Sequence, residues 1–246
     1  MPNFSVILAA AGKSQRFKDD HYKKPFAVLN KKAVWLHSAD RFLKRDDVKQ
    51  VIIVIAGDDR ESFMTKFGAN LAVLGIDVVI GGKERCDSVA NALAKVEPNA
   101  DFVAIHDAAR PCISDEDIEN VFNGAIANRA AILATPVTST LKKSTDGKTI
   151  DTTQDRRQLW QAQTPQVFAR DLLTDAYSKI GDDKPTDDAQ LLEQQGHAVA
   201  IVTGSPLNIK ITTKLDLRLA GACIDAMPKP RLDAPAHPFA DDNLWR

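Results

Sequence analysis

Positive charge gathers in the N-terminal part of the chain, directly after an apolar run that ends in small residues. The run LAAAG at 8–12 leads into cationic side chains at five positions, Lys13, Arg16, Lys18, Lys23 and Lys24. Small residues let a backbone approach an anion closely, and free N–H groups can cradle phosphate. This combination predicts a binding site for a diphosphate or a triphosphate.

Two familiar phosphate-binding motifs do not fit this segment. Gly12-Lys13-Ser14 matches the end of a P-loop, but the first glycine of that motif would fall at Ile7. The dinucleotide-binding fingerprint fails because Ser14 and Phe17 stand where it requires glycine. A plain strand–helix connection remains the alternative reading of this turn.

A carboxylate follows a second apolar run, in the segment IHDAARP at 105–111. Asp107 falls where a buried strand is expected to end, and a carboxylate there can hold Mg²⁺, which commonly bridges phosphates through one or two carboxylates. The alternative is an aspartate that caps the turn or pairs with Arg110. His106 has no serine or cysteine partner at a triad spacing, so we expect a structural role.

Two further segments carry polar side chains at the expected ends of strands. The segment NIKITT at 208–213 is another strand-like stretch, in which Lys210 alternates with isoleucines and would face away from them. The glycine-opened turn GGKERCDS at 81–88 precedes a helical stretch, Val89–Lys95, and could accept a base or a ribose. Taken alone, Lys210 could be an ordinary solvated lysine on an edge strand. The glycine-opened turn could be an ordinary loop.

The elements that must position these residues alternate along the chain. Continuous apolar runs predict buried strands at Phe4–Ala11, Val51–Ala56, Asp77–Ile80, Phe102–His106, Ala131–Val137 and Ala198–Val202. Helices are predicted at Lys32–Lys44 and Ser114–Asn128, the second with Ser114 as its N-cap. This alternation predicts an α/β fold with a mostly parallel sheet covered on both faces, whose ligands bind beyond the carboxyl ends of the strands.

Two regions depart from this alternation of strands and helices. Residues 138–161 are polar and contain Asp146-Gly147, which predicts a hairpin that protrudes as a β-arm. Residues 227–246 hold four of the twelve prolines and are typical of a poorly structured tail. We therefore expect one domain over 1–225, with the arm inside it, and a Pro-rich tail over 226–246.

Composition excludes several classes of protein. The 246 residues carry a formal net charge of −1, which argues against a protein that binds nucleic acid through bulk electrostatics. No apolar run approaches the length of a membrane span, and the N-terminus does not resemble a signal peptide. Three widely spaced cysteines without a metal-binding spacing indicate reduced thiols. A cytoplasmic location is expected.

In this order, the segments resemble one family, the 2-C-methyl-D-erythritol 4-phosphate cytidylyltransferases of the non-mevalonate route to isoprenoid precursors. The resemblance runs from about residue 4 to 222 and is carried by LAAAG, GGxERxDSV, HDAARP, LWxxQTPQ and NIKIT. It implies a three-layer α/β/α, Rossmann-like nucleotidyltransferase fold. It also implies transfer of CMP from CTP to the sugar-alcohol phosphate 2-C-methyl-D-erythritol 4-phosphate, with release of pyrophosphate and with Mg²⁺ or another divalent cation.

The resemblance also implies roles for individual residues. Contacts with CTP are implied for Ala10, Ala11, Gly12, Ser14, Gly82, Lys83 and Ser88. Asp107 corresponds to the aspartate near the metal and the nucleotide, and Lys210 to a lysine close to the phosphates. Arg16 and Lys24 correspond to residues that stabilise the transition state. Thr140 and Arg156 correspond to acceptor-binding residues on an arm that reaches a partner subunit, which implies a homodimer.

Some of these residue roles, and the function itself, leave alternatives open. Ser14 stands where the family usually has glycine. Lys23 competes with Lys24, and Arg157 with Arg156, which is preferred for its spacing of four residues to Trp160. A ribitol 5-phosphate cytidylyltransferase and a non-catalytic nucleotide-binding regulator on the same fold are the competing functions.

Overall fold

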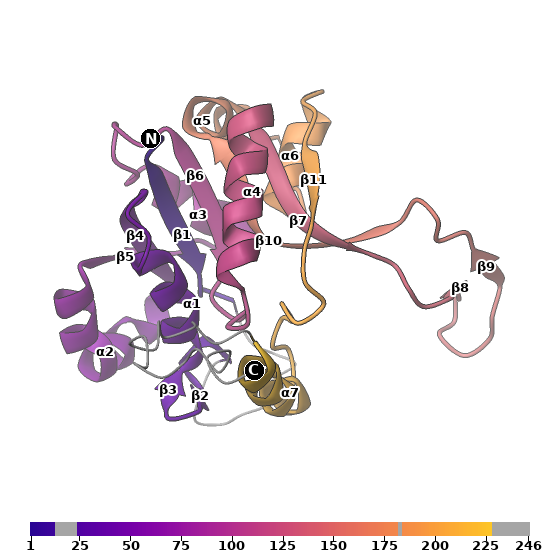
Figure 1. Ribbon diagram of the computed structural model, residues 1–246, viewed down its shortest axis with the longest axis horizontal. Helices are drawn as coiled ribbons and strands as arrows, with labels where there is room; N and C mark the ends of the chain where they lie inside the picture. Colours follow the sequence, from indigo (N-terminus) through magenta and orange to yellow (C-terminus); the bar gives the residue numbers. More distant parts are fainter. Residues whose placement is uncertain (13–23, 182–183, 228–246) are drawn as a thin grey trace, which may run out of the picture.

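The structure is a computed structural model that describes residues 1–12, 24–181 and 184–227 (Figure 1). A seven-stranded sheet has the order β11-β7-β10-β6-β1-β4-β5. Its strands are β1 (Phe4–Ala9), β4 (Val48–Ile55), β5 (Ile76–Ile80), β6 (Phe102–Asp107), β7 (Ala130–Pro136), β10 (Trp160–Ala169) and β11 (Ala200–Thr203). Strand β10 runs antiparallel to both of its neighbours, whereas the other pairings in this sheet are parallel.

Helices and short pairs of strands complete the described part of the chain. The α-helices are α1 (Val34–Leu43), α2 (Arg60–Leu74), α3 (Arg85–Leu93), α4 (Asp115–Asn128), α5 (Arg170–Ser178), α6 (Asp188–Gln194) and α7 (Lys214–Ala226). Short 3₁₀ turns lie at Lys24–Phe26 and Gly57–Asp59, and β2 (Val28–Leu29) pairs with β3 (Lys32–Ala33).

The sheet has an apolar core on each face, which confirms the predicted three-layer α/β/α fold. Side chains alternate along β1, so that Phe4, Val6 and Leu8 join one core and Ile7 joins the other. Helices α1, α2 and α4 cover the first face, and α3, α5 and α6 cover the second. Both faces of the central strands are thus buried, which explains their continuous apolar sequences.

Stacked aromatic rings join the first strand to the covering helix α4. The Phe4 and Phe122 rings stack with their centroids 3.9 Å apart, and the centroid of Phe102, beside Phe4 on the neighbouring strand, lies 5.3 Å from that of Phe4. The predicted N-cap is confirmed: the Ser114 hydroxyl accepts a hydrogen bond from the Asp117 N–H. The helix that covers the sheet is therefore fixed both at its start and along its buried face.

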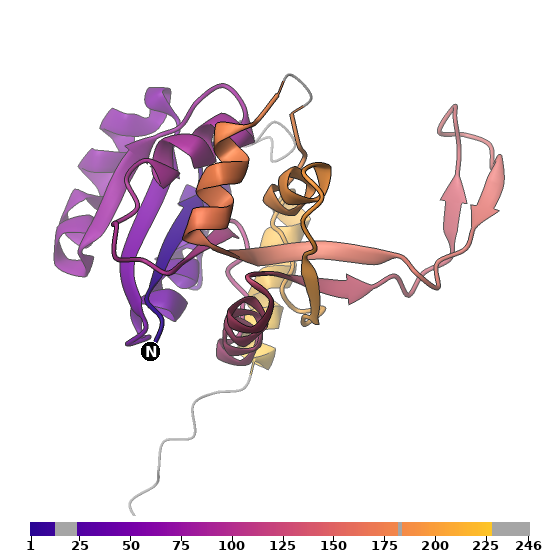
Figure 2. The ribbon, with the colours of Figure 1, turned by 90° about the horizontal axis from the view of Figure 1, so that it is seen from above.

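An arm projects far from the sheet, as the Asp-Gly signal predicts (Figures 1 and 2). At its tip, β8 (Leu141–Lys143) pairs antiparallel with β9 (Thr152–Gln154). Gly147 adopts a φ of 70°, and the Asp146 carboxylate accepts hydrogen bonds from the Lys148 and Thr149 N–H groups, both at 2.8 Å. The base of the arm is the continuation of β7 and β10 beyond the core.

Three sequence-based expectations are corrected by the structure. Asn208–Thr213 is not a strand: it crosses the end of the sheet, where the Ile211 N–H donates to the Ala109 carbonyl. The first helix begins at Val34 because the two residues before it form β3. Strand β10 was not expected, because polar residues and a proline interrupt its sequence.

The ends of several elements differ slightly from their predicted positions. The first strand stops at Ala9, and the small residues after it form a turn. At the other end of the domain, α7 reaches Ala226, and the Pro-rich tail over 228–246 lies outside the described residues. None of the helices in the described ranges is long and apolar enough to span a membrane.

Truncation of a stacked ring should destabilise the fold much more than truncation of an exposed side chain on the same helix. Phe122→Ala is expected to lower the free energy of unfolding by about 3–5 kcal/mol, because it removes a buried ring and leaves a cavity. Ile126→Ala, at an exposed position of α4, should change it by less than about 1 kcal/mol. Urea denaturation followed by circular dichroism measures both, and equal effects would contradict this packing of α4 on the sheet.

Candidate active site

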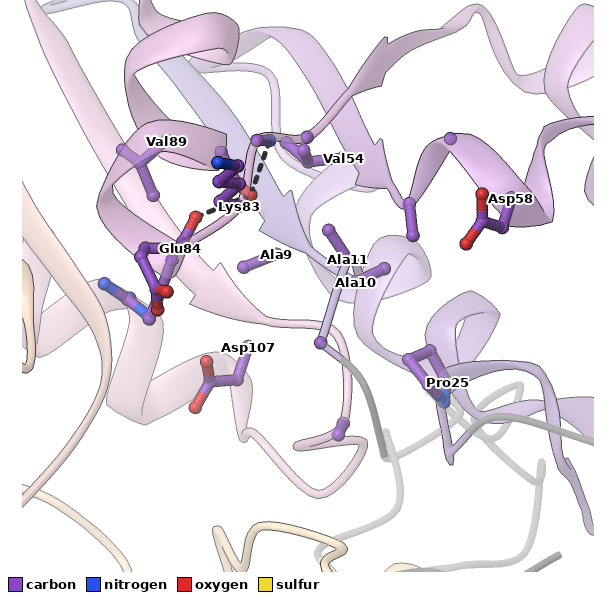
Figure 3. Close-up of a pocket in the computed structure, with 18 of the residues that line it drawn as sticks. Ala9, Ala10, Ala11, Pro25, Val54, Asp58, Lys83, Glu84, Val89 and Asp107 are labelled. Carbon is purple, nitrogen blue, oxygen red and sulfur yellow. Dashed lines mark hydrogen bonds between the residues drawn. The ribbon is translucent and has the colours of Figure 1, made fainter. Parts of the chain in front are cut away.

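A pocket of about 770 Å³ lies beyond the carboxyl ends of β1, β4, β5 and β6. Figure 3 shows Ala9, Ala10 and Ala11 between Asp107 and Glu84 on one side and Pro25 and Asp58 on the other. The pairing of β1 with β6 sets Ala9 directly beside Asp107, so the small-residue turn and the carboxylate share one edge. This is the position at which open parallel sheets bind ligands.

The Asp107 carboxylate is the electrostatic centre of the pocket. Its side chain is nearly buried, and its Oδ2 atom lies 2.8 Å from Lys210 Nζ and 3.4 Å from Arg110 Nε. The Arg110 guanidinium also donates to the Asn208 carbonyl at 2.8 Å, which ties the segment after β11 to the end of β6. Lys210 is not on a strand, and it lines the pocket.

Charge pairing keeps Asp107 ionised. Burial favours the neutral form of the carboxyl group, but attraction to Lys210, Arg85 and Arg110 outweighs burial and holds the Asp107 pKa well below its usual range. The stabilisation from this pairing is present at neutral pH and is lost only as the pH falls through that depressed pKa. The pocket therefore holds a fixed negative charge surrounded by cations throughout the physiological range.

The glycine turn after β5 forms another wall of the pocket. A Cβ atom at Gly81 would lie 2.6 Å from Ser88 Oγ, and one at Gly82 would lie 2.4 Å from the Asp87 Cβ, so neither position admits a side chain without movement. The Ser88 hydroxyl accepts from the Gly82 N–H at 3.1 Å and donates to the Glu84 carbonyl at 3.0 Å (Figure 3). The turn is thus a fixed surface that exposes backbone to a ligand.

An ion pair beside this turn was missed by the sequence analysis. Arg85 Nη1 lies 2.7 Å from Asp188 Oδ2, and the buried Asp188 carboxylate also accepts the Tyr177 hydroxyl at 2.6 Å. Burial opposes the charge on Arg85, but Asp188 and Asp107 raise its pKa above the ordinary value. Arg85 belongs to the GGxERxDSV motif, but no local sequence pattern indicates that it pairs with Asp188, which lies far away in the sequence.

Most of the residues assigned to the nucleotide come together, as the resemblance implies. One pocket is lined by Ala10, Ala11, Gly12, Gly82, Lys83, Ser88, Asp107 and Lys210. Ser14 and Arg16 lie outside the described residues, as do Lys13, Lys18 and Lys23. Lys24 begins a 3₁₀ turn, but its side chain lies outside the described part of the chain. The adjoining Pro25 lines the pocket, so this part of the chain returns to it.

The residues assigned to the acceptor do not line this pocket within one chain. Thr140 and Arg156 are both exposed on the arm, which projects away from the sheet (Figure 2). The Arg156 guanidinium donates to the Thr138 carbonyl, close to Thr140. Arg157 instead pairs with Asp155 at 2.6 Å, so Arg157 already has a carboxylate partner.

The donors available for a metal are carboxylates rather than a cluster of mixed ligands. No group of three or more His, Cys, Asp or Glu side chains suited to a metal occurs among the described residues. Asp58, Glu84 and Asp107 line the pocket. A lone carboxylate suits Mg²⁺, which often takes one or two protein ligands together with substrate phosphates. The three cysteines are buried free thiols.

Comparison with known proteins identifies the family. Residues 4–226 match the family model of 2-C-methyl-D-erythritol 4-phosphate cytidylyltransferase. A protein of that name from Rhodopirellula baltica is 42% identical over 233 residues, with 90% of this chain and 94% of the relative covered. One from Clostridioides difficile is 36% identical, with 88% and 92% covered.

Solved structures agree with the sequence relatives. A 4-diphosphocytidyl-2C-methyl-D-erythritol synthase superposes with a TM-score of 0.75 at 28% identity, covering 92% of this chain and all of the other. The 2-C-methyl-D-erythritol 4-phosphate cytidylyltransferase from Thermus thermophilus gives a TM-score of 0.73 at 29% identity, with the same coverage. The chain belongs to the 2-C-methyl-D-erythritol 4-phosphate cytidylyltransferase family.

Proposed function

We infer that the chain transfers CMP from CTP to 2-C-methyl-D-erythritol 4-phosphate and releases pyrophosphate. The observation that carries this function is the pocket in which Asp107, paired with Lys210 and Arg110, faces the small-residue turn after β1 and the glycine turn after β5. Family membership names the substrates, and the pocket supplies groups suited to a nucleoside triphosphate.

The chemical difficulty of the reaction is the approach of two anions. A phosphate oxygen of the acceptor attacks the α-phosphorus of CTP, and the bond from that phosphorus to the pyrophosphate oxygen breaks. The acceptor is already an anion, so no strong general base is needed. Fixed cations that offset the added negative charge should therefore supply most of the rate enhancement. We assign Arg16 and Lys24 to the α-phosphate and Lys210 to the phosphates of both substrates.

The two turns hold the nucleotide in different ways. Ala10, Ala11 and Gly12 line the pocket, and the absence of large side chains there leaves room for the triphosphate. Across the pocket, Gly82 and Ser88 form the rigid surface on which the cytosine and ribose would rest, with Lys83 beside them. Ser14 completes the contacts that we assign to CTP.

A divalent cation fits this pocket. Asp107 is the ligand that we assign to Mg²⁺, because its carboxylate remains ionised and lies where the triphosphate would bind. Mg²⁺ bound there with the phosphates would neutralise negative charge and orient the oxygens for displacement. We also place the reaction in the cytoplasm.

The arm completes the site from a second subunit. Thr140 and Arg156 lie on the arm, which projects away from the sheet (Figure 2), and neither lines the pocket of its own chain, so we expect them to reach an acceptor in another copy. Exposed apolar side chains on the arm, Ile150, Leu159 and Trp160, are consistent with burial against that copy. The guanidinium of Arg156 would hold the acceptor phosphate by a two-pronged contact that lysine cannot reproduce.

Loss of the Lys24 ammonium should slow the chemical step. Lys24→Ala is expected to lower kcat by at least ~10²-fold with little change in CTP affinity, because a donor to the transition state is lost. Lys23→Ala is the matched control and should retain most of the activity. Steady-state kinetics measures kcat, and titration calorimetry measures the affinity for CTP. An effect on KM alone, or a larger loss in the Lys23 variant, would show that the assignment is wrong.

Mixing two variants that are impaired at different residues tests the shared site, in assays at an acceptor concentration far below the raised KM of the Arg156 variant. Arg156→Ala should raise the KM for the acceptor, whereas Arg157→Ala should have a small effect because Arg157 pairs with Asp155. Co-refolded Arg156→Ala and Lys210→Ala subunits should recover about a quarter of the wild-type activity, since half of the dimers then contain one intact site. No recovery, despite mixed dimers being detected by mass spectrometry, would place the arm in the site of its own chain.

Acceptor choice separates the candidate functions. Pyrophosphate release with CTP should be fast with 2-C-methyl-D-erythritol 4-phosphate and at least ~10²-fold slower with ribitol 5-phosphate, because unmatched polar groups in a binding site are costly. The reverse preference would identify a ribitol 5-phosphate cytidylyltransferase. CTP binding without turnover of either acceptor would identify a nucleotide-binding regulator.

A further inference from the structure

We infer that His106 is a positioning residue for the transfer reaction: as a neutral imidazole protonated on Nε2, it fixes the segment that carries Asp107 and Arg110. This inference rests on the proposed function, because it concerns the same pocket. His106 lies on β6, is fully buried and does not line the pocket, so it cannot touch either substrate.

The hydrogen-bond partners define the state of the ring. His106 Nε2 lies 3.1 Å from the Arg110 carbonyl oxygen, which can only accept, so Nε2 carries the proton. His106 Nδ1 lies 3.1 Å from Thr164 Oγ1. The Thr164 hydroxyl has one proton to donate, so with Nδ1 as its acceptor both ring nitrogens have a partner and the ring needs only the one N–H, on Nε2.

The same hydroxyl also holds the backbone of Asp107. The Asp107 N–H donates to Thr164 Oγ1 at 3.0 Å. The hydrogen bonds thus run in one direction, from the Asp107 N–H to Thr164, from Thr164 to His106, and from His106 to the Arg110 carbonyl. Both ends of this series lie on the segment 107–110, so His106 and Thr164 together brace the turn that presents Asp107 and Arg110.

A second set of bonds connects Lys210 to this brace. The Asn208 side-chain amide donates to the Thr164 carbonyl at 2.9 Å, and the Asn208 carbonyl accepts from Arg110 at 2.8 Å. Lys210 follows two residues later and reaches Asp107 at 2.8 Å. The relative positions of the Asp107 carboxylate and its two nearest cations therefore depend on Thr164 and on the ring bonded to it.

Packing alone does not require a histidine at this position. The imidazole lies 5.3 Å from the Phe42 ring in an edge arrangement, a contact that an apolar side chain could also make. Its neighbours along β6, Ala104 and Ile105, are apolar and buried. The polar atoms of His106 are thus accounted for by Thr164 and the Arg110 carbonyl and not by the apolar core.

Three substitutions separate the two hydrogen bonds of the ring. His106→Gln can keep the donor to the Arg110 carbonyl, His106→Asn can keep the acceptor for Thr164, and His106→Leu keeps neither. We expect His106→Leu to lower kcat by at least ~30-fold while the KM for CTP changes less than about threefold, because a small misplacement of fixed charges affects the transition state most. The Gln and Asn variants should each recover part of kcat.

A matched control and a spectrum complete the test. His37→Leu removes another histidine bonded to a carbonyl, that of Leu29 at 2.8 Å, and should leave kcat within about twofold. Nitrogen-15 NMR of the wild-type enzyme should show His106 protonated on Nε2 alone. Melting temperatures show whether each variant is folded.

Two results would overturn the inference. One is a folded His106→Leu variant that keeps wild-type kcat, and the other is a wild-type spectrum with the proton on Nδ1. If the Leu variant fails to fold, the Gln and Asn variants take its place, and wild-type kcat in both would overturn the inference in the same way. Wild-type turnover in the same assay reports separately on the proposed function, since its absence would reject that function whatever the state of the ring.

Discussion

The buried carboxylate of Asp107 is the constraint on which the pocket depends. A charged group at this depth is stable only when cations and hydrogen bonds surround it. Lys210 and Arg110 supply the direct contacts, and Arg85 adds its charge from the start of α3, next to the glycine turn. These residues come from three distant parts of the sequence, so pairing with one carboxylate brings together the end of β6, the glycine turn and the segment after β11.

The order of strands makes this arrangement possible. Parallel pairing of β1 with β6 sets the small-residue turn beside Asp107, and β5 brings the glycine turn to the same edge. The antiparallel strand β10 then serves two purposes: its inner part carries Thr164 against the end of β6, and its outer part forms the base of the arm. One strand thus supports both the Asp107 segment at the pocket and the arm that we propose binds the acceptor.

Local patterns in the sequence predict part of this structure. The buried parallel strands were predicted from their continuous apolar runs. The N-cap at Ser114 and the turn at Asp146-Gly147 were predicted from residue types that are typical of these positions. The strand predicted at Asn208–Thr213 was wrong because alternation of side chains persists in an extended segment that has no strand partner. Local patterns did not predict strand β10 or the Arg85–Asp188 pair. Each depends on contacts between segments that are distant in sequence, and such contacts leave no local pattern.

A double-mutant cycle on Asp107 and Lys210 tests the central claim most directly. The measured quantity is kcat/KM for CTP in Asp107→Asn, Lys210→Met and the double variant, with folding verified by circular dichroism. If carboxylate and ammonium act as one unit, the double variant should lose no more than the worse single variant. If the two losses multiply, the side chains act independently, which would contradict the central role of the Asp107 carboxylate in organising the pocket.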